Sequence, residues 1–284
     1  MIKVEQLIYT YPGSEDPVLK DISFEIGKGE IFGFLGPSGA GKSTTQKVLN
    51  GILKHFKGSV FVNGNDLSRI NRSFYEKIGV AFEFPNLYTK LTALENLKLY
   101  ASFYNTVTAD PEYLLDLVGL TDDKNIRVEA YSKGMKMRLN FIRSILNNPE
   151  ILFLDEPTAG LDPVNARRMK DIILDLQNKG TTIFLTTHNM SDADELCGRL
   201  AFIVEGQLPV IDTTHALKLK HGKKVIKVEF RINGSTHIEE FELKDLSENQ
   251  RFQSILATEE IETIHTQEAT LESIFIKVTG KKLT

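Results

Sequence analysis

The sequence has one cysteine, no tryptophan and no long apolar run. The single residue Cys197 excludes a disulfide framework, fits a reducing compartment and is interpreted as a buried packing residue. Apolar runs such as ILFL at 151–154 fall far short of the roughly 20 residues that cross a bilayer, and the N-terminus lacks the apolar core of a signal peptide. A basic excess is also lacking, because the net charge is -4. We therefore expect no membrane span and no nucleic-acid partner.

The residues that are present favour an α/β fold. Three segments are almost continuously apolar, as expected of parallel strands covered on both faces: IFGFLG from Ile31, ILFLDE from Ile151 and TIFLTT from Thr182. Helical patterns separate them. One begins at Asp162, an N-cap followed by proline, and ends at Gly180. The sequence predicts an α/β core with a mostly parallel sheet.

Residues 84–148 have a helical pattern. Thr92 and Glu95 form a capping box ahead of a helix that we expect to run through Tyr104. Asp110, followed by proline, begins another helix, which Gly119 closes. We interpret this stretch as a helical subdomain inserted into an N-terminal domain of residues 1–213.

The pattern changes after residue 213. VIKVEFRI at 225–232 alternates strictly between apolar and polar residues, and the following Asn233 and Gly234 are typical of a hairpin turn. The last predicted helix carries one apolar face, made of Leu271, Ile274, Phe275 and Val278. We expect residues 214–284 to form a small α+β accessory domain.

One glycine-rich segment carries a recognisable chemistry. It matches G-x-x-x-x-G-K-[ST] between a strand and a helical pattern, and it contains Gly36, Pro37, Ser38, Gly39, Ala40, Gly41, Lys42 and Ser43. Glycines allow backbone amides to turn inward around phosphate oxygens, and the following helix adds its positive end. We expect Lys42 to contact the β- and γ-phosphates of ATP, Ser43 to bind Mg²⁺, and Thr44 to complete the binding set. The fold is then a P-loop NTPase core.

Polar residues end the two other apolar strands. Asp155 and Glu156 follow ILFL, at the sheet edge where open α/β folds bind their ligands. Asp155 is expected to hold Mg²⁺, and Glu156 to orient and polarise the attacking water. His188 follows TIFLTT, and we expect it to contact the γ-phosphate or that water, although a lone histidine is more often structural.

These residues resemble the ATP-binding subunits of ABC transporters over residues 1–206, with Walker A at 36–43 and Walker B at 151–156. YSKGM at 131–135 resembles the LSGGQ signature of that family and keeps Ser132 and Gly134. Ser132 also fits an ordinary helix N-cap. In the family this helix start binds the γ-phosphate held by a second subunit. The resemblance therefore implies a dimer, with a homodimer favoured, that encloses two ATP molecules.

Further positions match the family with less specificity. Residues 159–162 resemble the loop that crosses the dimer interface. Tyr11 fits the aromatic residue that stacks on adenine, although a surface or core tyrosine fits nearly as well. Glu83 occupies the position of the usual glutamine. We expect it to keep the metal contact and to alter nucleotide affinity, the alternative being a solvated loop charge.

The resemblance implies an ATPase that drives transport, with export favoured, through a separate membrane-spanning permease. Such a subunit lies in the cytoplasm on the inner face of the cell membrane. The segment 87–97 is the expected contact with the permease. The main alternative is an ABC-type ATPase that is not coupled to transport. A P-loop enzyme of another family, such as a kinase, and a regulatory module that no longer hydrolyses ATP are further alternatives.

Overall fold

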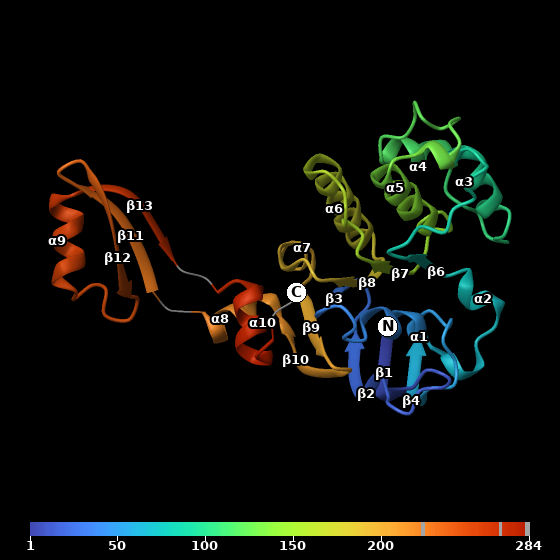
Figure 1. Ribbon diagram of the computed structural model, residues 1–284, viewed down its shortest axis with the longest axis horizontal. Coiled ribbons are helices and arrows are strands. Elements are labelled where there is room, and N and C mark those ends of the chain that lie inside the picture. The colour runs from blue at the N-terminus through green and yellow to red at the C-terminus, as the bar shows by residue number, and fades with distance from the viewer. Residues whose placement is uncertain (223–224, 267–268, 282–284) are drawn as a thin grey trace. The chain divides into compact units, whose positions relative to one another are not determined.

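The computed structural model describes residues 1–222, 225–266 and 269–281. They form two compact units, of which one contains Met1–Thr213 and the other is Thr214–Gly280. Figure 1 labels the elements of both units. None of the helices in these described ranges is both long enough and apolar enough to cross a bilayer.

A six-stranded sheet is the base of the first unit, in the order β10-β9-β3-β8-β7-β6. All neighbours in it run parallel except β10, which is antiparallel to β9. Every residue of β3, β7 and β8 is buried, which confirms the three predicted parallel strands. The strands are Ile78–Ala81 (β6), Ile151–Asp155 (β7), Thr182–Thr187 (β8), Ile31–Leu35 (β3), Arg199–Val204 (β9) and Gln207–Thr213 (β10).

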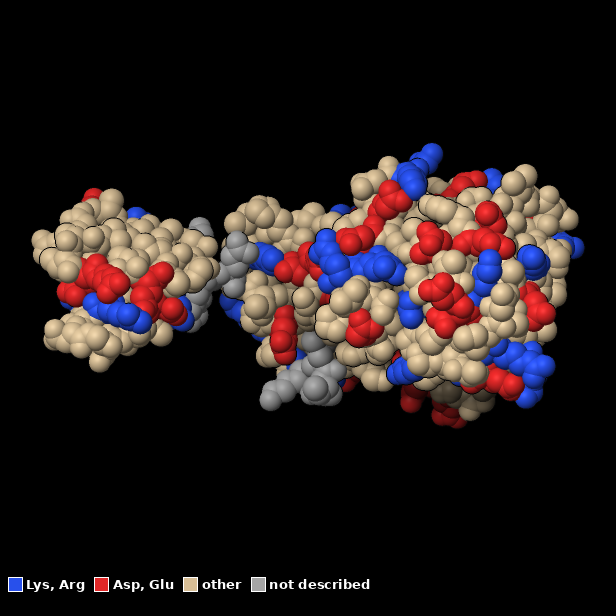
Figure 2. All heavy atoms as spheres, turned by 90° about the horizontal axis from the view of Figure 1, so that it is seen from above, with Lys and Arg blue, Asp and Glu red and all other residues tan. Residues whose placement is uncertain are grey.

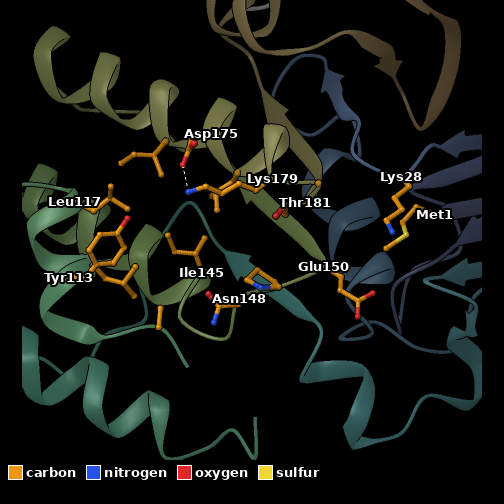
Figure 3. Close-up of a pocket in the computed structure, with 16 residues that line it drawn as sticks. Met1, Lys28, Tyr113, Leu117, Ile145, Asn148, Glu150, Asp175, Lys179 and Thr181 are labelled. Carbon is orange, nitrogen blue, oxygen red and sulfur yellow. Dashed lines mark hydrogen bonds and ion pairs between the residues drawn. The ribbon is translucent and has the colours of Figure 1, made fainter. Parts of the chain in front are cut away.

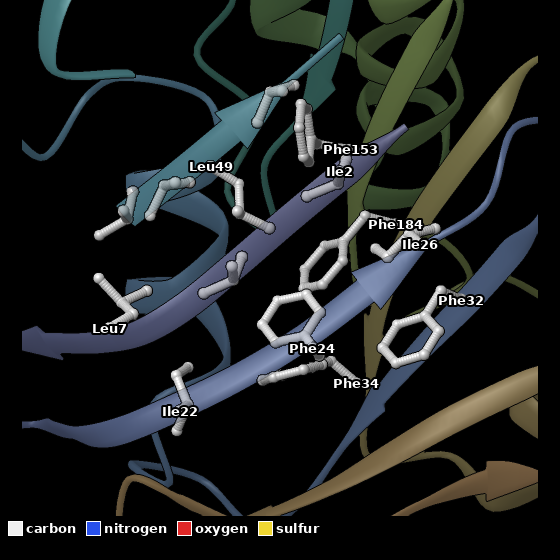
Figure 4. Close-up of a cluster of buried hydrophobic side chains, with 14 of the residues drawn as sticks. Ile2, Leu7, Ile22, Phe24, Ile26, Phe32, Phe34, Leu49, Phe153 and Phe184 are labelled. Atoms are coloured by element: carbon white, nitrogen blue, oxygen red, sulfur yellow. The ribbon is translucent and has the colours of Figure 1, made fainter. Parts of the chain in front are cut away.

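A four-stranded antiparallel sheet packs against the first one, and the sequence patterns do not predict it. Its order is β2-β1-β4-β5, with strands Leu19–Ile26, Ile2–Tyr9, Lys57–Val62 and Asn65–Asp66. The Phe24 ring of β2 lies 5.3 Å from Phe34 and 5.8 Å from Phe32, both of β3, and Phe184 of β8 joins them (Figure 4). Each fully buried phenylalanine stabilises the fold by roughly 1.5–3 kcal/mol. This aromatic layer holds β3, which leads into the phosphate loop.

Three helices of the first unit begin where their predicted cap residues lie. Thr92 and Glu95 form both bonds of the capping box of α3, and Asp110 caps α4. Asp162 caps α6. The helices are Lys42–Leu49 (α1), Arg72–Tyr75 (α2), Ala93–Ala101 (α3), Pro111–Leu117 (α4), Lys133–Ser144 (α5), Pro163–Asn178 (α6) and Met190–Leu196 (α7), with 3-10 turns at Leu67–Arg69 and Val128–Ala130.

The predicted end of α3 at Tyr104 is wrong. The helix ends at Ala101, and Ser102 is its C-cap. The backbone N–H of Asn105 instead donates to both carboxylate oxygens of Glu76, at 3.2 Å. A competing side-chain acceptor therefore ends the helix early.

Cys197 lies directly behind β3. It is buried, and a side chain on Gly33 would come within 2.8 Å of its sulfur atom. Burial raises the pKa of the Cys197 thiol to about 12, so the thiol stays protonated. The interpretation of Cys197 as a packing residue is confirmed.

The second unit contains a three-stranded sheet covered by one helix. Strands β11 (Val225–Ile232) and β12 (Ser235–Glu242) form the predicted hairpin, with Asn233 at φ 50° and Gly234 at φ 83°. Val228 and Phe230 pack against Phe252 of α9 (Gln250–Thr258), which the sequence patterns do not predict. The unit also contains α8 (Thr214–His221), β13 (Glu260–Thr266), which pairs with β11, and α10 (Leu271–Thr279), which packs on α8.

Charged side chains of both signs intermix on the face seen in Figure 2. Many charged side chains of the described residues form ion pairs, such as Arg167 with Glu195 at 2.6 Å and Arg251 with Glu239 at 2.6 Å. Exposed pairs of this kind contribute roughly 0–1 kcal/mol each to stability.

Candidate functional site

The phosphate loop joins β3 to α1 through a turn that only glycine fits at two positions. Gly41 has a φ of 114°, and a Cβ there would lie 2.8 Å from Leu19. A Cβ on Gly36 would lie 2.1 Å from the carbonyl oxygen of Ile203. Because Gly41 has no side chain to cap α1, the first amides of the helix stay available to an anion.

Lys42 folds back over this loop. Its Nζ donates to the carbonyl oxygens of Gly36 at 2.6 Å and Pro37 at 3.0 Å. Burial lowers the pKa of Lys42, and the nearby carboxylates of Glu156, Asp155 and Glu83 oppose that shift. The amine thus sits between the loop and three acidic groups, at the point where a phosphate would need a cation.

Glu156 is held firmly at the end of β7. Its Oε1 lies 2.9 Å from the backbone nitrogen and 2.7 Å from Nδ1 of His188, and its Oε2 accepts from the hydroxyl of Thr187 at 3.0 Å. The preceding Asp155 accepts a hydrogen bond from the hydroxyl of Thr186. The side chain of Glu156 is 8% exposed, so these bonds fix the direction of a buried carboxylate.

A cavity of about 380 Å³ opens between these groups. It brings together residues of the phosphate loop, of the segment after β6, and of the ends of β7 and β8. Its lining is Ser38, Gly39, Gly41, Lys42, Ser43, Thr44, Glu83, Asp155, Glu156 and His188. Tyr11 lies beside the lining, with its hydroxyl 3.1 Å from Oγ1 of Thr44. Gly36, Pro37 and Ala40 belong to the same loop.

Two further predicted residues, Ser132 and Gly134, lie outside both the lining and the phosphate loop. Ser132 is exposed, and its hydroxyl accepts from the backbone N–H of Met135 at 3.2 Å, which confirms it as the N-cap of α5. A Cβ on Gly134 would lie 3.6 Å from Leu161, an ordinary contact. Packing within this chain therefore leaves room for a side chain at position 134.

Four residues that the sequence patterns do not single out support the site: Thr158, Thr186, Thr187 and Asp192. The two threonines that end β8 were a usable signal, because β8 neighbours β7 and a strand-end hydroxyl is a natural partner for a carboxylate. Thr158, in the loop after β7, donates to Asp192 in the first turn of α7. A contact between segments so far apart in the chain has no signature in sequence.

A larger cavity, of about 520 Å³, lies away from this chemistry (Figure 3). It is lined by residues such as Met1, Tyr113, Ile145 and Leu117, with the Asp175–Lys179 ion pair at its rim. None of the predicted site residues is part of its lining. The smaller cavity is the candidate site, because it holds the phosphate loop, the strand-end carboxylates and His188.

Comparison with known proteins identifies the family. A family model described as ABC transporter matches residues 19–159, and one described as Fluoroquinolone efflux ABC transporter C-terminal domain matches residues 224–268. The chain is 50% identical over 285 residues to the fluoroquinolones export ATP-binding protein of Mycobacterium tuberculosis (strain CDC 1551 / Oshkosh), covering 100% of this chain and 95% of that protein. It is 30% identical over 312 residues to the linearmycin resistance ATP-binding protein LnrL of Bacillus subtilis (strain 168), covering 100% and 99%.

Solved structures agree with this result. A dimeric ATP-binding cassette in a post-hydrolysis state, bound to ADP and Pi, has a TM-score of 0.69 and 25% identity to this chain, over 75% of this chain and 98% of the other. The predicted P-loop fold and the ATPase activity are thereby confirmed, and a P-loop enzyme of another family is excluded. The chain belongs to the ATP-binding proteins of ABC transporters, which bind and hydrolyse ATP.

Proposed function

We propose that this chain hydrolyses ATP in a two-subunit sandwich and drives export through a separate permease on the cytoplasmic face of the membrane. The observation that carries the proposal is the cavity in which Lys42, Asp155, Glu156 and His188 meet the phosphate loop. The names of the relatives in M. tuberculosis and B. subtilis favour export, and fluoroquinolones are the first substrates to test.

The donor set of the cavity fits ATP together with Mg²⁺. Glu83, Asp155 and Glu156 bring three carboxylates against one lysine. A triphosphate entering this acidic cavity needs a divalent cation to offset the repulsion. Ser43, Asp155 and Glu83 offer the hard oxygen atoms that would hold it. When bound, the ion neutralises charge on the β- and γ-phosphates.

Glu156 and His188 then have different roles in the attack of water on the γ-phosphate. Glu156 accepts the water's hydrogen bond and polarises it, while His188 keeps the carboxylate in its orientation and presents its ring to the γ-phosphate. The His188 side chain is 62% exposed, so it can reach a bound phosphate. Lys42 leaves the loop carbonyls and contacts the phosphates.

The second subunit supplies what the cavity lacks. Ser132 begins the 12-residue helix α5 but does not line the cavity of its own chain. The free space beside Gly134 suits close approach of another molecule's phosphate to this helix start. We propose that Ser132 and Gly134 of one copy cover the nucleotide in a second copy.

The proposed docking site for the permease is a groove of about 440 Å³, whose lining includes Tyr100 of α3 but no residue of the expected contact segment 87–97. Its lining includes Ile52, Tyr75 and Phe103, which are 53%, 41% and 48% exposed. Arg72 and Arg143 supply cationic groups. Exposed apolar groups around a groove are typical of a site that takes an amphipathic helix from a partner.

Replacing Phe103 with Glu tests the transport role. We expect the amount of the chain recovered with membranes that contain its permease to fall at least tenfold, because a charge would be buried in the groove. ATP hydrolysis by the purified chain should change less than about twofold, since the cavity is untouched. Val107→Glu, which is 89% exposed and outside the groove, is the matched control. Equal membrane recovery of both variants would favour an ATPase that is not coupled to transport.

Replacing Glu83 with Gln tests the proposed metal contact. Loss of one negative charge should weaken Mg²⁺ and tighten metal-free ATP, each by about threefold to tenfold, since about 1 kcal/mol is typical of such a charge near a surface. The measurement is the Mg²⁺ concentration that gives half-maximal hydrolysis, together with ATP affinity in a chelator. If neither value moves, Glu83 is a solvated loop charge.

A further inference from the structure

Asp192 is a buried carboxylate in the first turn of α7 that connects the loop after Glu156 to the segment after His188. Its Oδ2 accepts from the hydroxyl of Thr158 at 2.5 Å and from Nδ2 of Asn189 at 3.1 Å. Thr158 comes two residues after Glu156, and Asn189 comes directly after His188. Asp192 is 7% exposed and does not line the cavity, so any effect on catalysis must pass through these partners.

A short chain of hydrogen bonds leads from Asp192 to the Glu156 carboxylate. Asn189, which Asp192 holds by its side chain, donates its backbone N–H to the hydroxyl of Thr187 at 2.9 Å. That hydroxyl donates onward to Oε2 of Glu156 at 3.0 Å. A movement of Asn189 would therefore disturb the carboxylate that faces the attacking water.

The backbone of Glu156 also needs external support. Its φ is 50°, a left-handed conformation that costs a non-glycine residue roughly 1–3 kcal/mol and persists only when the surroundings determine it. The carbonyl oxygen of Glu156 accepts from the N–H of Ala159 at 3.1 Å, which closes a turn around Thr158. The bond from Thr158 to Asp192 fixes this turn to the loop that carries His188.

Lys170 of α6 offsets the unfavourable burial of the Asp192 charge. Its Nζ lies 3.4 Å from Oδ1 of Asp192 and also pairs with Glu195. The side chains of Lys170 and Asp192 are 14% and 10% exposed. A buried carboxylate with an ion pair at one oxygen and two hydrogen bonds at the other has little freedom to move, so it can act as a fixed anchor.

We infer that Asp192 is a positioning residue for ATP hydrolysis, acting through Thr158 and Asn189 on Glu156 and His188. This inference rests on the proposed role of Glu156. Misplacement of a catalytic group by about 1 Å can cost on the order of 100-fold in rate. Losing one anchor of the two loops should therefore lower kcat while leaving the phosphate loop, and with it KM, nearly unchanged.

Thr158→Val is the sharpest test, because valine keeps the shape of threonine and removes only the hydroxyl. We expect kcat for ATP to fall about tenfold, with KM within about twofold of the unmodified chain. Thr158→Ser, which keeps the hydroxyl, should restore at least half of kcat. Melting temperatures of both variants should lie close together, so a general loss of folding can be recognised.

A double-mutant cycle ties the effect to Asp192. Asp192→Asn should slow hydrolysis to a similar degree, and the double variant with Thr158→Val should be no slower than the slower single variant. Arg167→Ala is the matched control. It removes an exposed ion pair between Arg167 of α6 and Glu195 of α7, the helices that carry Lys170 and Asp192, and it should leave kcat unchanged.

Four results would test these claims, two of them on Asp192 and Thr158 and two on Glu156. Normal kcat in Thr158→Val, or rate losses that multiply in the double variant, would refute the positioning role of Asp192. If Glu156→Gln is inactive in the same assay, the proposed function survives that refutation. If Glu156→Gln hydrolyses ATP normally, the roles of both Glu156 and Asp192 fail together.

Discussion

Replacing Glu156 with Gln is expected to lower kcat by about 100-fold or more while ATP stays bound. A group that polarises the attacking water contributes on the order of 10²–10⁴ to the rate. Glutamine keeps an oxygen that can accept from His188, so the loops should stay in place. With Mg²⁺ and ATP, the stalled variant should elute as a dimer in size-exclusion chromatography coupled to light scattering, each copy retaining one nucleotide.

Glu150→Gln is the matched control for this experiment. Glu150 lies in the larger cavity, away from the phosphate loop, and accepts from Nδ2 of Asn63. Its replacement should leave both turnover and assembly unchanged. A Glu156→Gln chain that bound ATP but stayed monomeric would refute the sandwich, whereas one that turned over at the normal rate would refute the role of Glu156.

Replacing Lys42 with Met should weaken ATP binding by about 10- to 100-fold. Hydrogen bonds to charged groups contribute about 1.5–3 kcal/mol, and Lys42 is the lysine in the cavity lining that can meet the phosphates. Equilibrium binding of a fluorescent ATP analogue in the presence of Mg²⁺ measures the loss. Lys47→Met, on the same helix but outside the cavity, provides the control. Unchanged affinity in Lys42→Met would contradict the assigned role of this lysine.

The same substitution should also remove a pH dependence from the stability of the nucleotide-free chain. Burial lowers the folded-state pKa of Lys42, so the protonated amine costs stability at pH values below that pKa. This cost disappears only as the pH rises from the folded-state pKa to the ordinary lysine pKa of 10.5. Methionine does not titrate, so the melting temperature of the unmodified chain should rise relative to that of Lys42→Met as the pH rises through this window.

Much of the site could be predicted because its chemistry lies in short segments. Residues 36–43 match a loop motif whose glycines and lysine have direct structural reasons, and Gly36 and Gly41 prove to be positions that admit no Cβ. Asp155 and Glu156 could also be predicted, because they directly follow a fully apolar strand segment and so lie at the edge of the sheet. The hairpin at Asn233 and Gly234 is equally local.

The antiparallel sheet and the Asp192 anchor could not be predicted in this way. Strand β1 has register shifts against both of its neighbours, which interrupt the alternation that would indicate a strand. Asp192 follows His188 by four residues, and nothing in its neighbours marks it as a partner of Thr158. Such residues acquire their role only when distant segments meet.

The sequence alone determined the fold class, the phosphate loop and the two strand-end carboxylates, because each depends on a few consecutive residues. Only the tertiary structure decided that Lys42 rests on its own loop, that Glu156 is clamped by His188 and Thr187, and that Ser132 stays outside the cavity of its own chain. The physical reason is that hydrogen bonds and burial depend on distances in space, and residues far apart in the chain are brought to those distances by the packing of the two sheets and their helices.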